Sequence, residues 1–486
     1  MSAKKRYHIE RNMPGDDKAQ ARAAVDKIVV RKGLDLPVDG IAERRLTDAT
    51  GIALYAVKPA DFVGLQPRLT VAEGDTVQAG TPLFVDKHDE RIRFTSPVAG
   101  RVKAIMRGEK RRLLSVTVEK GTPAAENATP PYPTSLPPRE LMLQTGLWSL
   151  LRQRPFGTVP SPEAKPKAIM VSLFDSSPLA PDYDFALQGR EGDLSKGLAV
   201  LATLTEGALH ICYRKGQRLS QQLPTHLPQL RLHEVEGPHP AGNIGTLIAH
   251  ICPLNKGEQV WTMNPHDIAT LGHLADTGEY LPERVVAVAG PQCANPHYYR
   301  IIAGAQVHTL VAGQIPNEDY PSTTTRRRMR IISGNMLSGQ QIDSDGYIGA
   351  YDSMLTLLPE GDYYDFMGWL MPGVRKHSFS RTFLSGMLPR PLTRVLLSPY
   401  RFDTNMHGSV RPLVFTGNFE RVFPFDIYPL QLLKACIIGD VELMEKLGIY
   451  EVEPEDFALC EYIDPSKTDM QPIIREALET LRKEAL

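Results

Sequence analysis

Thiolates are the side chains that could give this chain redox or metal chemistry, and their spacing argues against both. The five cysteines are Cys212, Cys252, Cys293, Cys436 and Cys460. No two of them form the C-x₂-C pair used by iron–sulfur and zinc sites, and no two histidines form an H-x₃-H pair. We therefore expect reduced, mostly packed thiols and no metal site.

Cys460 nevertheless lies in a stretch, FALCEYIDPSK, that resembles part of a cluster motif. Bacterial ferredoxin-type domains bind clusters through C-x₂-C-x₂-C-x₃-C-P. Here Asp464 and Pro465 stand where that motif has C-P, and Phe457 and Pro454 stand at the two earlier ligand positions. The chain either transfers electrons or keeps the shape of a domain that has lost its cluster.

Length and composition limit the class of protein. A chain of 486 residues and 53.9 kDa exceeds one hydrophobic core, so several domains are expected. A net charge of −1 gives no overall attraction for nucleic acid or anionic lipid. No apolar run approaches the ~18–20 residues that cross a bilayer, and the basic start lacks a signal-peptide core. We expect a cytoplasmic chain without a nucleic-acid partner, whose membrane association requires a partner or a local patch.

Residues 69–105 predict a small β-barrel module. Short β-rich runs are separated by E-G-D, Q-A-G and P-V-A-G turns, where glycine permits a positive φ. The stretches EGDTVQAGTPL and SPVAG resemble the barrel-sandwich fold of biotinyl and lipoyl carrier domains. Lys87 would be the modified lysine of a carrier, but it lies two residues too far from SPVAG. An unmodified barrel is favoured.

Beyond a Pro-rich linker, strands alternate with helices, which predicts a Rossmann-like α/β domain. KAIMVSLF and ALHICY have the length of buried strands, and Asn264, Pro265 and Gly278 bound a predicted helix. Gly242 and Gly245 could open another helix and hold a phosphate, although a plain tight turn is favoured. PERVVAVAGPQCANPHYYRIIAGAQV then predicts two short strands of a β module. PLQLLKACIIGDVELMEKLG and a stretch opening with Ser466 predict helices.

This order of modules resembles the family of A subunits of Na⁺-translocating NADH:quinone oxidoreductases. It is more distantly similar to the C subunits of Rnf complexes and to the flavoprotein subunit of respiratory complex I. KGLDLPVDG, GPHPAGNIGTLIAHI and YYDFMGWLMPG carry the resemblance. It implies an α/β multidomain chain with barrel-sandwich, Rossmann-like and β-grasp domains, followed by a helical domain like a ferredoxin domain without clusters.

The expected domains have these boundaries: a polar lead-in at 1–28, an N-terminal region with the barrel-sandwich at 29–122, a linker at 123–140, the Rossmann-like domain at 141–257, the β-grasp domain at 258–345, an aromatic-rich β insertion at 346–410 and the helical domain at 411–486.

The resemblance also implies that the chain has lost its redox centres. The eight cluster positions of the Rnf-type relative fall on Leu413, Thr416, Phe419, Phe423, Pro454, Phe457, Cys460 and Asp464. One thiolate of eight remains, and clusters require thiolates. Where the relatives have a Gly-rich flavin loop, residues 145–162 carry Leu, Trp and Arg. We expect no cofactor and no catalytic centre in this chain. NADH, FAD, FMN, iron–sulfur clusters and quinone would reside on other subunits.

Two functions remain open, besides a third, an independent flavin oxidoreductase, which a colourless purified protein would exclude. In the first, the chain is a peripheral subunit on the inner face of the bacterial membrane, docked chiefly on the quinone-reducing B subunit in the membrane. There it would shape access for ubiquinone or menaquinone. In the second, it is a stand-alone carrier or ligand-binding module. An intact mass that shows an adduct on Lys87 would favour the second.

Two sets of residues are candidates for the first function. A quinone headgroup needs apolar walls and a few donors, which would be supplied by Leu34, Leu36, Trp148, Leu151, Arg152, Arg154 and Phe156. Six aromatics lie between Tyr347 and Trp369, and a projecting hairpin there would dock on a partner through Tyr363, Tyr364, Phe366 and Trp369.

Overall fold

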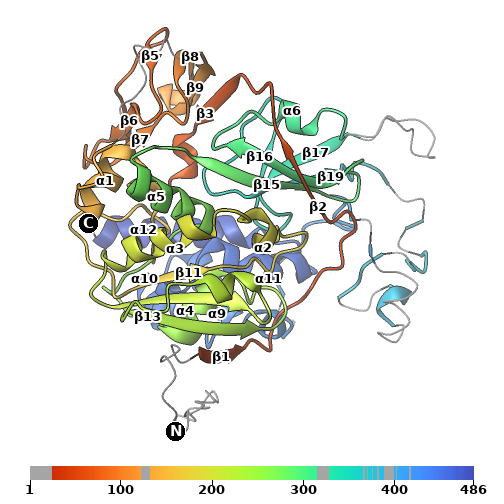
Figure 1. Ribbon diagram of the computed structural model, residues 1–486. Coiled ribbons are helices and arrows are strands. Elements are labelled where there is room, and N and C mark those ends of the chain that lie inside the picture. The colour runs from red at the N-terminus through yellow and green to blue at the C-terminus, as the bar shows by residue number, and fades with distance from the viewer. Residues whose placement is uncertain are drawn as a thin grey trace.

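The computed structural model describes residues 25–121, 132–314, 328–364, 367–368, 370–374, 376–379, 383–387, 399–400, 402–414 and 417–485. These residues form four sheets and a C-terminal group of helices (Figure 1). The α/β sheet, the helical unit and the loop after β17 together line the candidate site.

The largest parallel sheet has the strand order β1-β13-β12-β11-β14-β10. Its strands are β1 (Val25–Val29), β13 (Leu230–Glu236), β12 (Ala208–Arg214), β11 (Ala168–Ser172), β14 (Val260–Thr262) and β10 (Arg152–Arg154). All pairs are parallel except β10 with β14. The apolar run of β11 is buried almost throughout, as expected for a strand covered on both faces.

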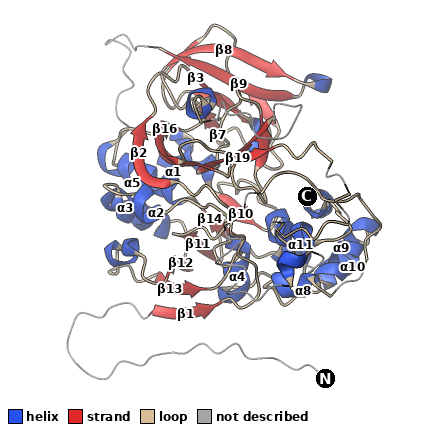
Figure 2. Ribbon diagram, turned by 90° about the vertical axis from the view of Figure 1, so that its right-hand side faces the viewer, coloured by secondary structure: helices blue, strands red, loops and turns tan. Residues whose placement is uncertain are grey.

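Helices cover both faces of this sheet. Helices α3 (Glu191–Ala202) and α5 (Pro265–Thr277) pack against each other on one face, and α4 (Ile244–Ile251) lies on the other (Figure 2). The signals at α5 act as predicted: the Asn264 side chain accepts from the His266 N–H, Pro265 opens the helix and Gly278 ends it at φ 76°. Two short helices, α1 (Pro138–Thr145) and α2 (Tyr183–Ala186), complete this unit.

The predicted barrel-sandwich consists of two small antiparallel sheets. One has the order β3-β9-β8-β5, with β3 (Leu54–Val57), β9 (Leu113–Lys120), β8 (Gly100–Arg107) and β5 (Thr76–Val77). The other has β4 (Pro67–Leu69), β6 (Pro82–Asp86) and β7 (Arg93–Thr95). Phe84 and Phe94 stack in the core with ring centroids 4.9 Å apart. Lys87 is exposed in the connection from β6 to β7.

The remaining sheet has the order β18-β17-β19-β15-β16-β2. Its strands are β18 (Gln340–Ile342), β17 (Met329–Ser333), β19 (Met354–Pro359), β15 (Glu283–Ala289), β16 (His297–Ile302) and β2 (Glu43–Asp48), and α6 (His308–Val311) follows β16. The predicted pair β15 and β16 is antiparallel. The central strand is β19, whose six residues are all buried.

The C-terminal unit contains α8 (Phe419–Val422), α9 (Pro429–Ile438), α10 (Val441–Lys446), α11 (Ala458–Ile463) and α12 (Met470–Ala485). The predicted break at Gly439 is present, since α9 ends there at φ 71° and Asp440 caps α10. The last helix begins at Met470 and not at Ser466. The Glu461 carboxylate accepts from the N–H groups of Met470 and Gln471 and supplies the cap from a distance.

The domain boundaries differ from those expected because several strands pair far along the sequence. Strand β1 begins inside the expected lead-in and pairs with β13, while β2 pairs with β16. Strand β14 and helix α5 belong to the α/β unit although they follow residue 257. Strand β19 joins β15 and β17, so the region from 346 is not a separate insertion. A proline-rich stretch predicts a linker between domains. It does not predict which sheet a strand on either side of the linker will join.

Candidate functional site

A cavity of about 200 Å³ lies at the carboxyl ends of β11 and β14. The chain continues from β11 to β12 and β13 on one side, and then returns through α4 to β14 on the other side of β11. The strand order therefore reverses between β11 and β14. Open α/β sheets bind ligands at such a reversal, outside the carboxyl ends of the strands. A neighbouring cavity of about 360 Å³ shares Arg152, Asp175, Asn264 and Glu455 in its lining.

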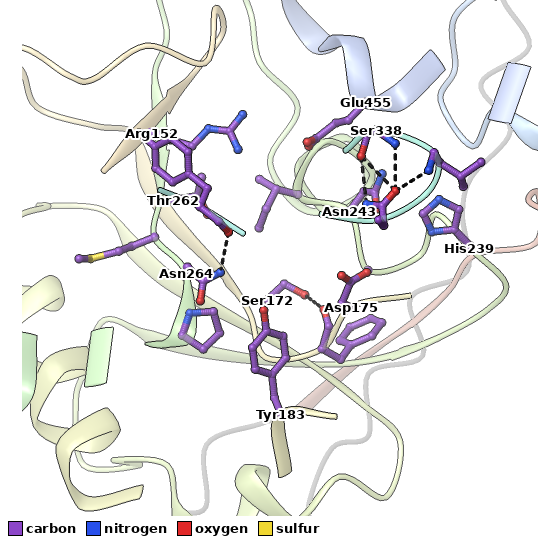
Figure 3. Close-up of a pocket in the computed structure, with 18 of the residues that line it drawn as sticks. Arg152, Ser172, Asp175, Tyr183, His239, Asn243, Thr262, Asn264, Ser338 and Glu455 are labelled. Carbon is purple, nitrogen blue, oxygen red and sulfur yellow. Dashed lines mark hydrogen bonds between the residues drawn. The ribbon is translucent and has the colours of Figure 1, made fainter. Parts of the chain in front are cut away.

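Three units of the fold contribute to this cleft (Figure 3). The α/β sheet supplies Asp175 after β11 and Asn264 after β14. The loop after β17 supplies Ser338, and the C-terminal unit supplies Glu455. That loop is fixed by the Asn335 side chain, whose Oδ1 accepts from the N–H groups of Leu337 and Ser338 at 2.8 and 2.9 Å. The cleft thus depends on how the units pack together.

His239 lines the cleft and contacts Ser176. Its Nδ1 lies 3.1 Å from Ser176 Oγ, and that oxygen accepts from the Gly242 N–H at 2.8 Å. Which of the two groups donates in the Ser176–His239 contact depends on the tautomer of the ring. Burial lowers the pKa of His239. A serine–histidine pair used for nucleophilic attack also needs a carboxylate on the second ring nitrogen, and among the described residues His239 has no such hydrogen bond.

The glycine turn before α4 packs against protein groups where a phosphate could have been bound. A Cβ at Gly242 would crowd Ser176, and one at Gly245 would overlap the carboxylate of Asp456. Asp456 is buried and belongs to the 3₁₀ turn Pro454–Phe457 of the C-terminal unit. A protein carboxyl group thus occupies the space at the start of α4 that a bound phosphate would need. The tight-turn interpretation of this stretch is the one that the structure supports.

A buried ionic network joins β10 to the same 3₁₀ turn. Arg154 is 3% exposed, pairs with Glu455 and lies 3.8 Å from Oδ2 of Asp456. Burial raises the pKa of Asp456 to about 8, against the opposing effect of Arg154. Burial also disfavours the charge of Glu455, but Arg154, Arg152 and Arg475 together outweigh it and lower that pKa. Arg475 pairs with the neighbouring Glu453 at 2.7 Å.

The residues predicted to contact quinone separate into two groups. Arg152 and Arg154 line the cleft, and the Arg152 guanidinium lies 5.1 Å from the centre of the Tyr351 ring. The other five do not form walls of this cleft. Leu36, Trp148 and Leu151 are buried in the main core, while Leu34 and Phe156 pack against the core of the helical unit.

Trp148 lies in the main core and not in the cleft. Its ring packs edge-on against Trp261 with centroids 5.5 Å apart, and its Nε1 donates to the Pro160 carbonyl at 2.9 Å. It is fully buried. The sequence showed an aromatic near two arginines, but the 3₁₀ turn Leu147–Leu150 directs the ring into the core.

The positions that the resemblance aligns with cluster ligands form part of a packed core. Phe419, Phe423, Phe457 and Cys460 are all buried in the helical unit, and the rings of Phe423 and Phe457 lie 5.0 Å apart. Burial raises the pKa of the Cys460 thiol, which disfavours the thiolate that a cluster needs.

The other cluster positions have ordinary structural roles. Leu413 packs against the same core, Pro454 opens the 3₁₀ turn, and the buried Asp464 accepts from the N–H groups of Ser466 and Thr468. Thr416 lies outside the described residues.

The aromatic segment is not a projecting hairpin in the part that the structure describes. Strand β19 ends at Pro359, and residues 360–364 have no strand. The Tyr363 hydroxyl donates to Asp403 at 2.6 Å, while Tyr364 is fully exposed. Tyr351 packs inward against Phe62. Phe366 and Trp369 lie outside the described residues. Of the two docking candidates that are described, Tyr364 is the exposed one, so the docking prediction rests on it.

Asp175, His239, Asn264 and Glu455 were missed as site residues. Asp175 follows the predicted strand KAIMVSLF directly, and Asn264 was predicted as a helix cap one residue before α5. Their positions after two parallel strands would have predicted the shared edge. Glu455 gave no such signal, because its place depends on the packing of the helical unit.

Within the described ranges, no helix has both the length and the apolar character needed to cross a membrane. The same residues contain no group of three or more His, Cys, Asp or Glu side chains that could hold a metal ion.

Comparison with known protein families gives three matches along the chain. Residues 28–121 match the NqrA N-terminal barrel-sandwich hybrid domain, residues 138–280 the NqrA second alpha/beta domain, and residues 285–344 the NQRA C-terminal domain. The second match extends to residue 280 and so includes β14 and α5, in agreement with the structure.

Full-length relatives match at 36% identity. One is the A subunit of the Na(+)-translocating NADH-quinone reductase of Yersinia pseudotuberculosis serotype I, aligned over 466 residues, 94% of this chain and 100% of the relative. Another is its counterpart of the same name from Neisseria meningitidis serogroup B, aligned over 464 residues with the same coverage. Among solved structures, an NAD⁺-reducing [NiFe]-hydrogenase in the H₂-reduced state matches 47% of this chain and 48% of its own, with a TM-score of 0.34 and 14% identity, too low to support an argument.

Proposed function

The chain belongs to the family of A subunits of Na⁺-translocating NADH-quinone reductases, and from this membership we propose that it is a peripheral subunit of such an enzyme, acting at the end where quinone is reduced. Its role there is to dock on the membrane part of the enzyme, chiefly on the B subunit, and to shape the access of quinone. In this arrangement it lies on the cytoplasmic face of the membrane.

We further propose that the chain contributes no redox centre of its own. The observation that supports this most directly is the packing of Phe419, Phe423 and Phe457 in one core, because their rings fill space at positions where the Rnf-type motif has cysteines. NADH, flavins, clusters and quinone chemistry then belong to other subunits. The purified chain should show no flavin absorbance and no stoichiometric iron, and either signal would contradict the proposal.

The cleft supports the quinone part of the proposal through Arg152. Its guanidinium lines both cavities, lies over Tyr351 and has no ion-pair partner among the described residues. An arginine with free N–H groups can donate to a quinone carbonyl. In the assembled enzyme, Arg152→Gln should raise the KM for quinone while kcat changes little.

Arg300 offers a matched control, because it is an exposed arginine paired with Asp48 at 3.1 Å. Arg300→Gln should leave the KM for quinone unchanged. If Arg152→Gln also leaves it unchanged in an enzyme that retains all its subunits, the cleft does not take part in quinone access.

The carrier alternative keeps one supporting observation, which is that Lys87 is exposed in the β6–β7 connection. Intact-mass measurement of the chain purified from its own cells decides between the two. The sequence mass supports the subunit without a covalent group, and a lipoyl- or biotinyl-sized increase that is lost in Lys87→Arg supports the carrier.

A further inference from the structure

The β8–β9 hairpin carries a compact group of cations at its tip. Strands β8 and β9 are antiparallel, and the turn between them runs from Arg107 to Arg112. The hairpin lies at the pole of the molecule opposite β1 (Figure 2). Lys110 and Arg111 have φ of 53° and 61°, a left-handed conformation that glycine adopts more easily. The chain thus has two long cationic side chains at positions where glycine residues would be less strained.

The charge of this tip is not neutralised within the described part of the molecule. Arg107, Lys110, Arg111 and Arg112 are exposed, and none forms an ion pair there. Glu109 is the one acidic residue of the turn, so four cations and one anion leave a net charge of +3. By contrast, Lys103 on the same hairpin pairs with Glu119 at 3.2 Å. The tip therefore concentrates positive charge on a chain whose total is −1.

Two apolar side chains flank the cations. Met106 is 54% exposed and Leu114 is 44% exposed, one on each strand beside the turn. Leu114 lies over Gly108, where an added Cβ would be 3.2 Å from its methyl groups. Exposed apolar side chains beside Lys and Arg are the combination that binds the headgroup region of a bilayer, where the apolar side chains become buried and the cations meet anionic lipids.

We propose that this tip, residues 106–114, binds the anionic lipid headgroups of the membrane surface. This contact with lipid is separate from the docking on a membrane subunit. It rests on the proposed function, because that function places the chain beside a membrane. A convex turn with a methionine and a leucine beside it fits the wide, deformable headgroup layer. A nucleic acid would engage the cations but would leave both apolar side chains without contacts.

The expected strength of binding is modest and salt-dependent. Each Lys or Arg near an anionic surface contributes about 1 kcal/mol, which is about a fivefold change in partitioning. The loss of two cations should therefore weaken binding about 25-fold. Raising the salt from about 0.1 M to about 0.5 M shortens the Debye length and should weaken the binding of the wild-type chain as well.

The test is co-sedimentation of the full chain with vesicles. Phosphatidylcholine vesicles that contain about a third phosphatidylglycerol should bind the chain, and pure phosphatidylcholine vesicles should bind it far less. Lys110→Gly with Arg111→Gly removes two charges and suits the left-handed backbone, so the melting temperature should not fall while binding to anionic vesicles falls about 25-fold. Met106→Ser with Leu114→Ser should weaken binding without changing its salt dependence.

A control with the same charge change uses exposed lysines of the helical unit. Lys434→Glu with Lys483→Glu should leave vesicle binding within about twofold, whereas Lys110→Glu with Arg111→Glu should abolish it. Vesicle binding that survives the tip substitutions, or that is equal on neutral vesicles, overturns the proposal. If the tip variants bind vesicles normally but fail to assemble with the membrane subunits in detergent, the tip binds a protein instead. A wild-type chain that binds anionic vesicles but does not assemble with those subunits contradicts the proposed function and leaves this inference standing.

Discussion

Asp456 shows at the scale of one residue how the units of this molecule are joined. Its carboxyl group is buried beside Gly245 at the start of α4, with Arg154 3.8 Å away. Glu453 and Glu455 are the other charged groups that act on it. Nothing in the spacing of the sequence indicated this contact, because it joins residues that lie far apart along the chain. In the sequence, this region differed from others only in the resemblance of Cys460 and its neighbours to a cluster motif.

Asp456 should make stability depend on pH. Burial raises its pKa from 3.8 to about 8, so between these two values the folded chain holds a proton that the unfolded chain has released. Its contribution to stability is therefore complete below pH 3.8 and is lost as the pH rises through about 8, with a slope of up to about 1.4 kcal/mol per pH unit. Asp456→Asn should flatten this slope in urea unfolding measured from pH 5 to 9. An unchanged slope would show that Asp456 does not titrate in this window.

Trp148 provides a second prediction at this scale. Because it is fully buried against Trp261, Trp148→Ala should cost about 3–5 kcal/mol of unfolding free energy, and Trp148→Phe clearly less. Urea unfolding of the purified chain measures both. A loss of quinone affinity in the Ala variant would then reflect unfolding. Trp148→Phe that folds normally but binds quinone poorly would restore Trp148 as a contact residue.

At the scale of elements, helix ends that depend on neighbouring residues were predicted correctly. Helix ends and strand pairings that depend on residues far along the chain were not. Helix α5 was predicted with both ends because its cap residues, Asn264 and Gly278, are its own neighbours in sequence. The start of α12 was misplaced because its first N–H groups are bound by Glu461, which lies in another helix. The apolar residues of the strands predicted several of them. The sequence of a strand does not show which other strand it pairs with, so β1 and β2 could not be assigned to their sheets.

The packing of α4 against the helical unit gives a matched pair of glycine substitutions. Gly245 and Gly192 are each the second residue of a helix, α4 and α3 respectively. A Cβ at Gly245 would overlap the Asp456 carboxylate, whereas one at Gly192 would meet nothing within 4 Å. Gly245→Ala should destabilise the chain by about 1–3 kcal/mol, and Gly192→Ala should stabilise it by about 0.5–1 kcal/mol. Thermal unfolding checks both, and two equal shifts would contradict the close approach.

At the scale of the whole molecule, the extent of the packed cores explains why expected and observed domains differ. One core runs without interruption through the barrel-sandwich, the α/β sheet and the β19-centred sheet, and it includes Phe94, Ile169 and Leu357. The helical unit has a core of its own around Phe423 and Phe457. The sequence patterns predicted the modules in their order along the chain. They did not show that the first three modules share a core. A third, smaller core with Met170 and Leu247 lies between the α/β sheet and α4.

Arg154 should hold the helical unit onto the rest of the molecule. Arg154→Met removes the ion-pair partner of Glu455, whose side chain is 28% exposed, so the cost should be below the ~3–5 kcal/mol of a fully buried pair. Lys256 and Glu445 form another ion pair between the same two units at 2.6 Å, but Lys256 is 70% exposed, so Lys256→Met should cost at most about 1 kcal/mol. In calorimetry, Arg154→Met should move the unfolding of the helical unit to a lower temperature and separate it from the main transition.

Lys256→Met should leave the wild-type profile almost intact. The separate core of the helical unit gives this result a physical basis, since a unit with its own core can remain folded or unfold separately once its attachment is weakened. If Arg154→Met instead lowers one undivided transition, the helical unit is too dependent on the main core to unfold alone. If both variants behave alike, the attachment is carried by apolar contacts such as those of Leu34 and Phe156 with the helical core, and the buried ion pair serves to set the position of Glu455 in the cleft.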